Sequence, residues 1–155
     1  MQQLERKNDF LHGVKAGMAG AAVKYGFNEL MQLIGIAKYD NNVTSLTVVF
    51  STYQHTPFYW LIGFLHALMI GAFFGVCIAF VFDYILTPQY YLLKSLGIGV
   101  FIYFLNFGLM ARAFHYPSDL PRLPGDVISM FISLLLYAAV TGWVLKKQGF
   151  FEQSE

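Results

Sequence analysis

Residues 13–35, GVKAGMAGAAVKYGFNELMQLIG, decide how this chain is interpreted. The stretch is long enough to cross a bilayer, yet charged and amide side chains occur throughout its second half. A Lys or Glu in hydrocarbon costs about 3 kcal/mol on insertion scales, so the polar side of this helix is expected to face protein or water. At about 100° per residue, small residues and then polar residues share that side: Gly13, Gly17, Gly20, Ala21, Lys24, Asn28, Gln32 and Gly35.

The composition indicates an integral membrane protein. Of the 155 residues, 57% are hydrophobic and 12% are charged, and the mean hydropathy is +0.53. Soluble domains carry about 25% charged residues. The net charge of +1 gives no support for nucleic-acid binding. Cys77 is the single cysteine, which excludes an intramolecular disulfide, and the polar first nine residues argue against a cleavable signal peptide.

The predicted fold is an all-α bundle of four transmembrane helices in one domain, 1–155, with helices at about 9–38, 58–86, 90–116 and 126–147. The connector, 39–57, is rich in β-branched residues and is expected to be partly extended. The short turn at 87–91 predicts that the second and third helices form an antiparallel hairpin. An even number of spans places both termini on one side, and the distribution of Lys and Arg assigns that side to the cytoplasm.

Small residues recur at four-residue spacing, which lets helices approach closely in lipid. Because two helices carry such a stripe, and one helix pair needs less, we expect a homo-oligomer or an unidentified membrane partner besides the lipid bilayer. The last helix carries hydroxyl groups at the same spacing, at Ser129, Ser133, Tyr137 and Thr141. The predicted packing glycines are Gly13, Gly17, Gly20, Gly63, Gly71 and Gly75.

Six side chains are candidates for a polar site inside the membrane: Lys24, Asn28, Glu29, Gln32, Asp83 and Asn106. Two interpretations remain open. In the first, they line a path for an ion, a proton or a small solute. In the second, ion pairs such as Lys24 with Asp83, or Glu29 with Arg112, fix the helix packing. An interfacial position for Asp83 and an interhelical hydrogen bond for Asn106 are the corresponding structural roles.

A second candidate site, for an anion or a lipid headgroup, lies at the outer interface and comprises Arg112, His115, Asp119 and Arg122. A solvated polar network is its structural alternative. The four histidines, His12, His55, His66 and His115, include no pair at i,i+4 spacing, so no metal site and no cofactor are expected. Haem ligation by His66 together with a second chain is the one exception considered. No catalytic residues are assigned, because no nucleophile, phosphate-loop or paired-carboxylate pattern is present.

Three segments carry a family resemblance: GVKAGMAGAAVKYGFNEL at 13–30, YYLLKSLGIGV at 90–100 and HYPSDLPRLP at 115–124. On these segments the chain resembles the small four-helix bacterial inner-membrane proteins of the YagU and YqhR type, although it lacks their additional sequence. The resemblance implies an inner-membrane location and a link to envelope or acid stress, and it supplies no catalytic residues.

Three classes of function follow from these observations. In the first, the polar residues of the first helix serve ion, proton or small-solute permeation. In the second, the same stripe is a helix-docking interface of a non-catalytic subunit or scaffold. The third, a small membrane enzyme similar to four-helix glutathione transferases, requires a basic cytoplasmic face, and only scattered basic residues are present.

Overall fold

The computed structural model describes residues 2–38, 56–110 and 123–151, with side chains from residue 9 onward in the first range and up to residue 109 in the second. The predicted all-α fold is confirmed for these residues, and they contain no strand. The helices are α1 (Gln2–Leu33), α3 (Pro57–Tyr84), α4 (Tyr91–Tyr103) continued by the π-helix η1 (Phe104–Met110), and α6 (Pro124–Lys147). The expected extended connector, 39–57, lies almost entirely outside the described residues.

Helix α1 differs from its prediction at both ends. It begins at Gln2, so the polar N-terminal residues are helical, and it ends at Leu33 instead of near residue 38. Gly35 ends it with a positive φ of 73°, and the Ile36 N–H bonds the Met31 carbonyl at 3.0 Å. This left-handed closing turn favours glycine, which has no Cβ to clash. The turn brings the Lys38 N–H to the Asp126 carboxylate, 2.7 Å away, so the end of α1 is bonded to the start of α6.

The same kind of turn ends α6. Gly149 has a φ of 73°, and the Phe150 N–H bonds the Leu145 carbonyl at 3.2 Å. The chain therefore reverses and buries Phe150 and Phe151 at this end of the bundle, where Phe151 packs edge-on against Phe82 at 5.1 Å.

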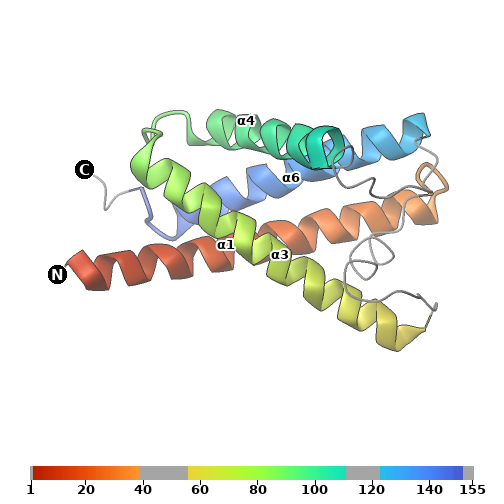
Figure 1. The fold of residues 1–155 in the computed structure, drawn as a ribbon, viewed down its shortest axis with the longest axis horizontal. Helices are drawn as coiled ribbons and strands as arrows, with labels where there is room; N and C mark the ends of the chain where they lie inside the picture. Colours follow the sequence, from red (N-terminus) through yellow and green to blue (C-terminus); the bar gives the residue numbers. More distant parts are fainter. Residues whose placement is uncertain (1, 39–55, 111–122, 152–155) are drawn as a thin grey trace.

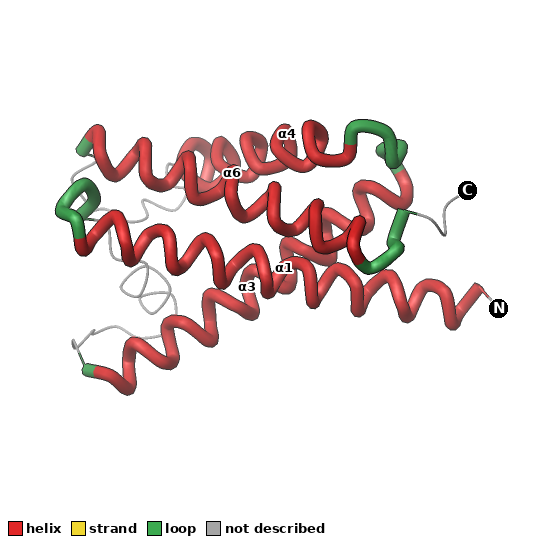
Figure 2. The backbone as a smooth tube through the Cα atoms, turned by 180° about the vertical axis from the view of Figure 1, so that it is seen from behind, coloured by secondary structure: helices red, strands yellow, loops and turns green. Residues whose placement is uncertain are grey.

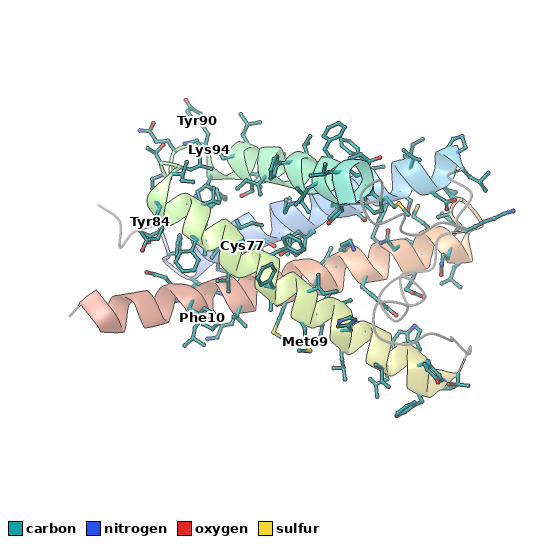
Figure 3. The ribbon with its side chains drawn as sticks, viewed as in Figure 1. Phe10, Met69, Cys77, Tyr84, Tyr90 and Lys94 are labelled. Atoms are coloured by element: carbon teal, nitrogen blue, oxygen red, sulfur yellow. The ribbon has the colours of Figure 1, made fainter. Side chains whose placement is uncertain are left out.

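The turn between α3 and α4 is short, as predicted, but the two helices do not form a packed hairpin. Tyr90 adopts a left-handed conformation with φ 56°, and the Lys94 ammonium bonds the carbonyl and hydroxyl oxygens of Thr87 at 2.8 and 2.6 Å. Figure 3 shows Tyr90 and Lys94 together at this turn. From there α3 and α4 diverge (Figure 1) and do not pack extensively against each other. The short connection is confirmed, and it does not make the two helices pack along their length.

The helices pack in the order α3, α1, α6, α4. Figure 1 shows α3 and α4 in front of α1 and α6, and Figure 2 shows the same arrangement from behind. Among the described residues, α3 and α4 are consequently apart from each other, with α1 and α6 behind them, and the separation between α3 and α4 is termed the opening.

The glycine stripes of α1 and α3 meet each other. A Cβ added at Gly13 would lie 2.7 Å from the Val76 Cα, and one added at Gly17 would lie 2.8 Å from the Gly75 Cα. On the neighbouring side of α1, a Cβ at Gly20 would lie 2.7 Å from the Tyr137 carbonyl oxygen of α6. Both stripes are thus used within the chain, which removes the reason given for self-association; the homo-oligomer itself stays a prediction.

The helix expected over 90–116 also differs from its prediction as one α-helix. It is α-helical to Tyr103 and then π-helical to Met110, and its remaining predicted residues lie outside the described part of the chain. A π-helix has a wider turn than an α-helix and occurs often at functional sites.

Three helical segments are long and apolar enough to cross a membrane: Pro57–Tyr84, Tyr91–Leu109 and Pro124–Lys147, with mean hydropathies of 2.3, 1.7 and 2.0 over their most apolar windows. Large apolar side chains such as Met69, which is 71% exposed, and Phe73, which is 64% exposed, cover their outer surfaces. The chain is therefore an integral membrane protein in contact with lipid. The start of α1 and the end of α6 lie at the same end of the bundle (Figure 1).

Candidate functional site

All four helices contribute to a pocket at the base of the opening between α3 and α4. Its volume is about 90 Å³. Since roughly 10–15 Å³ of such volume accommodates one water molecule, the pocket has room for several water-sized groups. It is lined by Ala21, Lys24 and Tyr25 of α1, Ala67, Ile70, Gly71 and Phe74 of α3, Ile102 of α4, Asn106 of η1, and Leu134 and Tyr137 of α6.

The pocket lies at mid-height of the bundle. On α3, Ala67 follows the first helical residue by ten positions and Phe74 precedes the last by ten. On α6, Leu134 likewise follows the first helical residue by ten positions, and Tyr137 precedes the last by ten. Ten residues of helix span about 15 Å, which is half the hydrocarbon thickness of a bilayer.

Among the described residues that line this pocket, Lys24 is the only charged one. Its side chain is half-buried, and within the described part of the chain its ammonium group has no hydrogen bond or ion pair. Asn106, from the π-helical segment across the pocket, is also half-buried. Together these two side chains supply an ammonium group and an amide, both hydrogen-bond donors, to a pocket whose walls are otherwise largely apolar.

Tyr137 closes the floor of the pocket. Its buried hydroxyl donates a hydrogen bond of 2.7 Å to the Gly71 carbonyl, which joins α6 to α3 next to α1. The Thr141 hydroxyl in turn donates to the Tyr137 carbonyl at 2.7 Å. The Tyr137 proton is therefore already engaged in a bond between helices.

An aromatic cluster flanks the pocket on the side where α3 begins. Tyr25, which is 4% exposed, packs edge-on against Trp60 at 5.7 Å and against Phe64 at 5.1 Å. The Trp60 and Phe64 rings are stacked at 5.9 Å. Trp60 is therefore separated from the pocket by one ring.

The structure divides the predicted polar stripe. Lys24 faces the pocket, whereas Asn28 is 3% exposed and its carbonyl oxygen accepts a hydrogen bond of 3.4 Å from Ser129 of α6. The Asn28 amide nitrogen is buried and has no partner among the described residues. Glu29 and Gln32 are half-buried and do not line the pocket. Asn28 therefore has the packing role, and Lys24 and Asn106 are brought together.

Asp83 lies elsewhere, so the predicted alternative of an ion pair between Lys24 and Asp83 does not occur. Asp83 is twelve residues beyond Gly71 on α3, which is about 18 Å along the helix axis. It is exposed, and it lines a separate cavity of about 140 Å³ with Asp9, Phe10 and Tyr84. Figure 3 shows Phe10 and Tyr84 at the end of the bundle where α1 begins.

The other predicted sites cannot be placed in the same way. The whole outer-interface group lies outside the described residues: Arg112, His115, Asp119 and Arg122. The predicted ion pair of Glu29 with Arg112 therefore also falls outside them. His12 packs edge-on against Phe150 at 6.3 Å, and His66 is half-buried on α3. In the ranges that the structure describes, no three metal-ligating side chains gather.

Two residues of the site were missed from the sequence. Tyr137 was assigned to a packing stripe, and Tyr25 was assigned no role. The signal available for Tyr137 was its hydroxyl at the middle of an apolar helix, where a buried tyrosine needs a hydrogen-bond partner. No signal in a single sequence indicated which helix supplies that partner.

The chain matches no protein-family model, no curated protein and no solved structure at a significant level.

Proposed function

We propose that the protein is a four-span membrane carrier that takes a small organic anion into its bundle at Lys24. The observation that carries this proposal is an ammonium group without a partner among the described residues, beside a pocket at mid-height of the helices. A charged group in hydrocarbon is costly unless it is paired or solvated, and intramembrane charges commonly mark substrate pathways. An anion held by Lys24 and Asn106 would supply the missing partner.

The fourth span of this proposal is α1. Gly13 and Gly17 approach α3, Gly20 approaches α6, and the turn after the helix is bonded to Asp126 at the start of α6. A helix that runs beside two membrane-crossing helices over this distance shares their depth in the bilayer. Both termini are then on the same side. Lys94, Lys146 and Lys147 at that end support a cytoplasmic assignment by the positive-inside rule. A reporter fused to the C-terminus tests the assignment, which a periplasmic signal would overturn.

The position of the pocket favours a carrier over an open pore. Binding sites of membrane transporters are typically near the bilayer midplane, between helices. A pore would instead need the polar stripe of α1 to face a continuous aqueous path. Asn28, one turn beyond Lys24, is buried against Ser129, and Gly17, two turns before it, is in contact with α3.

The proposal is tested by anion uptake into proteoliposomes that contain the purified full chain. Benzenesulfonate is a suitable probe because it stays ionised and crosses lipid slowly on its own. We expect saturable benzenesulfonate uptake well above that of protein-free liposomes, and no uptake of the cation benzyltrimethylammonium. Lys24→Met removes the charge at nearly constant length. Removing one member of a buried charge pair costs about 2 kcal/mol or more, so uptake at low concentration should fall roughly thirtyfold.

Two further variants make the test specific. Lys24→Arg keeps the positive charge and should retain most of the uptake. Lys15→Met removes a lysine of the same helix that is exposed and does not line the pocket, and it should transport like the unaltered protein. Uptake at the level of empty liposomes, or undiminished uptake by a folded Lys24→Met variant, would refute the carrier.

A further inference from the structure

We infer that the natural ligand of the pocket is a single-chain carboxylic amphiphile, a long-chain fatty acid in chemical class, whose carboxyl group sits at Lys24 and Asn106 and whose chain leaves between α3 and α4. This inference rests on the proposed function for the role of Lys24, and it adds the identity of the ligand and its route of entry. Three features of the site lead to it: its charge, its size and its opening.

The charge of the site matches one carboxylate. Lys24 is the only charged side chain that the described residues place in the lining of the pocket, so a ligand with one negative charge compensates it. The ligand carboxyl group and the Lys24 side chain together carry no net charge, whether they form a carboxylic acid with a neutral amine or a carboxylate with an ammonium ion. The two forms differ only in the position of one proton, so no proton is gained or lost overall. The Lys24 ammonium and the Asn106 amide provide donors for both oxygens, since the Tyr137 hydroxyl already donates to Gly71.

The size of the pocket fits a head group and not a whole lipid. A volume of about 90 Å³ holds a carboxyl group and the first methylenes of a chain. A phospholipid would have to bring its glycerol backbone and two chains to the same place. Its phosphodiester also remains charged, whereas a carboxylic acid reaches the middle of a bilayer in its neutral, protonated form.

The opening of the bundle gives the chain an exit. Most of the residues that line the pocket are apolar, and the helices α3 and α4, which both contribute to it, do not pack extensively on each other. Ile70, at this border, is 40% exposed. The ribbons of α3 and α4 lie farther apart toward the start of α3 (Figure 1), and Tyr25 and Trp60 form the aromatic cluster on that side of the pocket. A hydrocarbon chain that leaves the pocket in this direction stays in apolar surroundings.

The first test is a fluorescence titration of the full chain in nanodiscs with cis-parinaric acid, a single-chain fatty acid that becomes fluorescent when bound. We expect saturable binding of one acid per chain. The methyl ester of the same acid, which cannot carry the charge, should bind at least tenfold more weakly. Lys24→Met should lose at least tenfold in affinity for the acid, and Lys15→Met should stay within twofold of the unaltered protein.

Two variants test the route of the chain. Ile70→Trp places a bulky side chain at the exposed border of the pocket, and it should weaken parinaric acid binding at least tenfold. In single-tryptophan proteins made by Trp143→Phe or Trp60→Phe, one equivalent of 9,10-dibromostearic acid should quench Trp60 strongly and Trp143 little. Trp143 lies near the opposite end of the bundle, beside Lys147 at 5.3 Å.

The outcomes separate the ligand from the carrier. Equal affinity for acid and ester, undiminished binding by Lys24→Met, or equal quenching of both tryptophans would overturn the fatty-acid inference. If parinaric acid does not bind while benzenesulfonate uptake depends on Lys24, the carrier stands and the fatty-acid inference fails. If parinaric acid binds at Lys24 while benzenesulfonate uptake is absent, the inferred ligand stands and the carrier fails.

Discussion

Adding one methyl group at Gly17 is expected to force α1 and α3 apart. A Cβ at this position would lie 2.8 Å from the Gly75 Cα and 3.0 Å from the Gly71 carbonyl carbon, where ordinary contact begins near 3.4 Å. The obstructing atoms belong to a helix backbone, so no side-chain rotation relieves the overlap. The two helices must therefore separate by at least about 0.6 Å.

The cost of this separation follows from the loss of packing across the interface. A gap of about 0.5–1 Å removes roughly a quarter to a half of the attraction of each atom pair, and overpacking typically destabilises a core by about 1–3 kcal/mol. Helices in lipid depend on this attraction because no hydrophobic effect drives them together. Gly17→Ala should accordingly lower the free energy of unfolding.

Gly26→Ala is the matched control on the same helix. A Cβ at Gly26 meets no atom within 4 Å, so this variant makes the same chemical change without a clash. Both variants gain the higher helix propensity of alanine, worth up to about 1 kcal/mol, and this gain cancels in their comparison. The difference between their unfolding free energies, measured by reversible SDS titration in mixed micelles, should be about 1–3 kcal/mol with Gly17→Ala the less stable. Agreement within about 0.5 kcal/mol would refute the close α1–α3 contact.

Three further predictions concern polar contacts between helices, and each is measured by the same titration. Tyr137→Phe removes the hydrogen bond to Gly71 and should cost about 0.5–1.5 kcal/mol; an unchanged midpoint would contradict this bond. The double variant Asn28→Leu, Ser129→Ala replaces a weak buried hydrogen-bonded pair by apolar groups. It should be at least as stable as the unaltered protein, because the Asn28 amide nitrogen has no partner in the described structure. A marked loss of stability would show that the pair is stabilising. Asp126→Ala leaves the N–H after α1 without its acceptor and should cost about 1–3 kcal/mol, whereas a neutral result would separate the end of α1 from α6.

Packing on one face of α1 was predictable from the sequence because it depends on the helical repeat alone. Gly13 and Gly17 contact α3 and Gly20 contacts α6, so the side of α1 that was expected to avoid lipid does face protein. The hydroxyl spacing of α6 likewise predicted contacts with other helices, and both Ser129 and Tyr137 make them.

The site itself was not predictable in the same way. Lys24, Asn106 and Tyr137 come from three helices, and they meet because α3 crosses α1 and then diverges from α4. That geometry depends on which glycine stripe packs against which, and spacing within one helix carries no information about it. The π-helical turns around Asn106 add a second unpredicted step, because they alter the direction of side chains relative to an α-helix.

The composition of α1 follows from its place in the bundle. It packs against both α3 and α6, and it is the one long helix that is not apolar enough by average hydropathy to be identified as a span. A mean hydropathy taken over all residues of the helix gives its buried side and its outer side equal weight. On the outer side, Leu11, Met18 and Val23 are each 40–44% exposed, and a helix needs apolar residues only where it meets lipid. The inner side can therefore hold glycines for close packing and a lysine that lines the pocket, and under the proposed function this lysine binds the ligand.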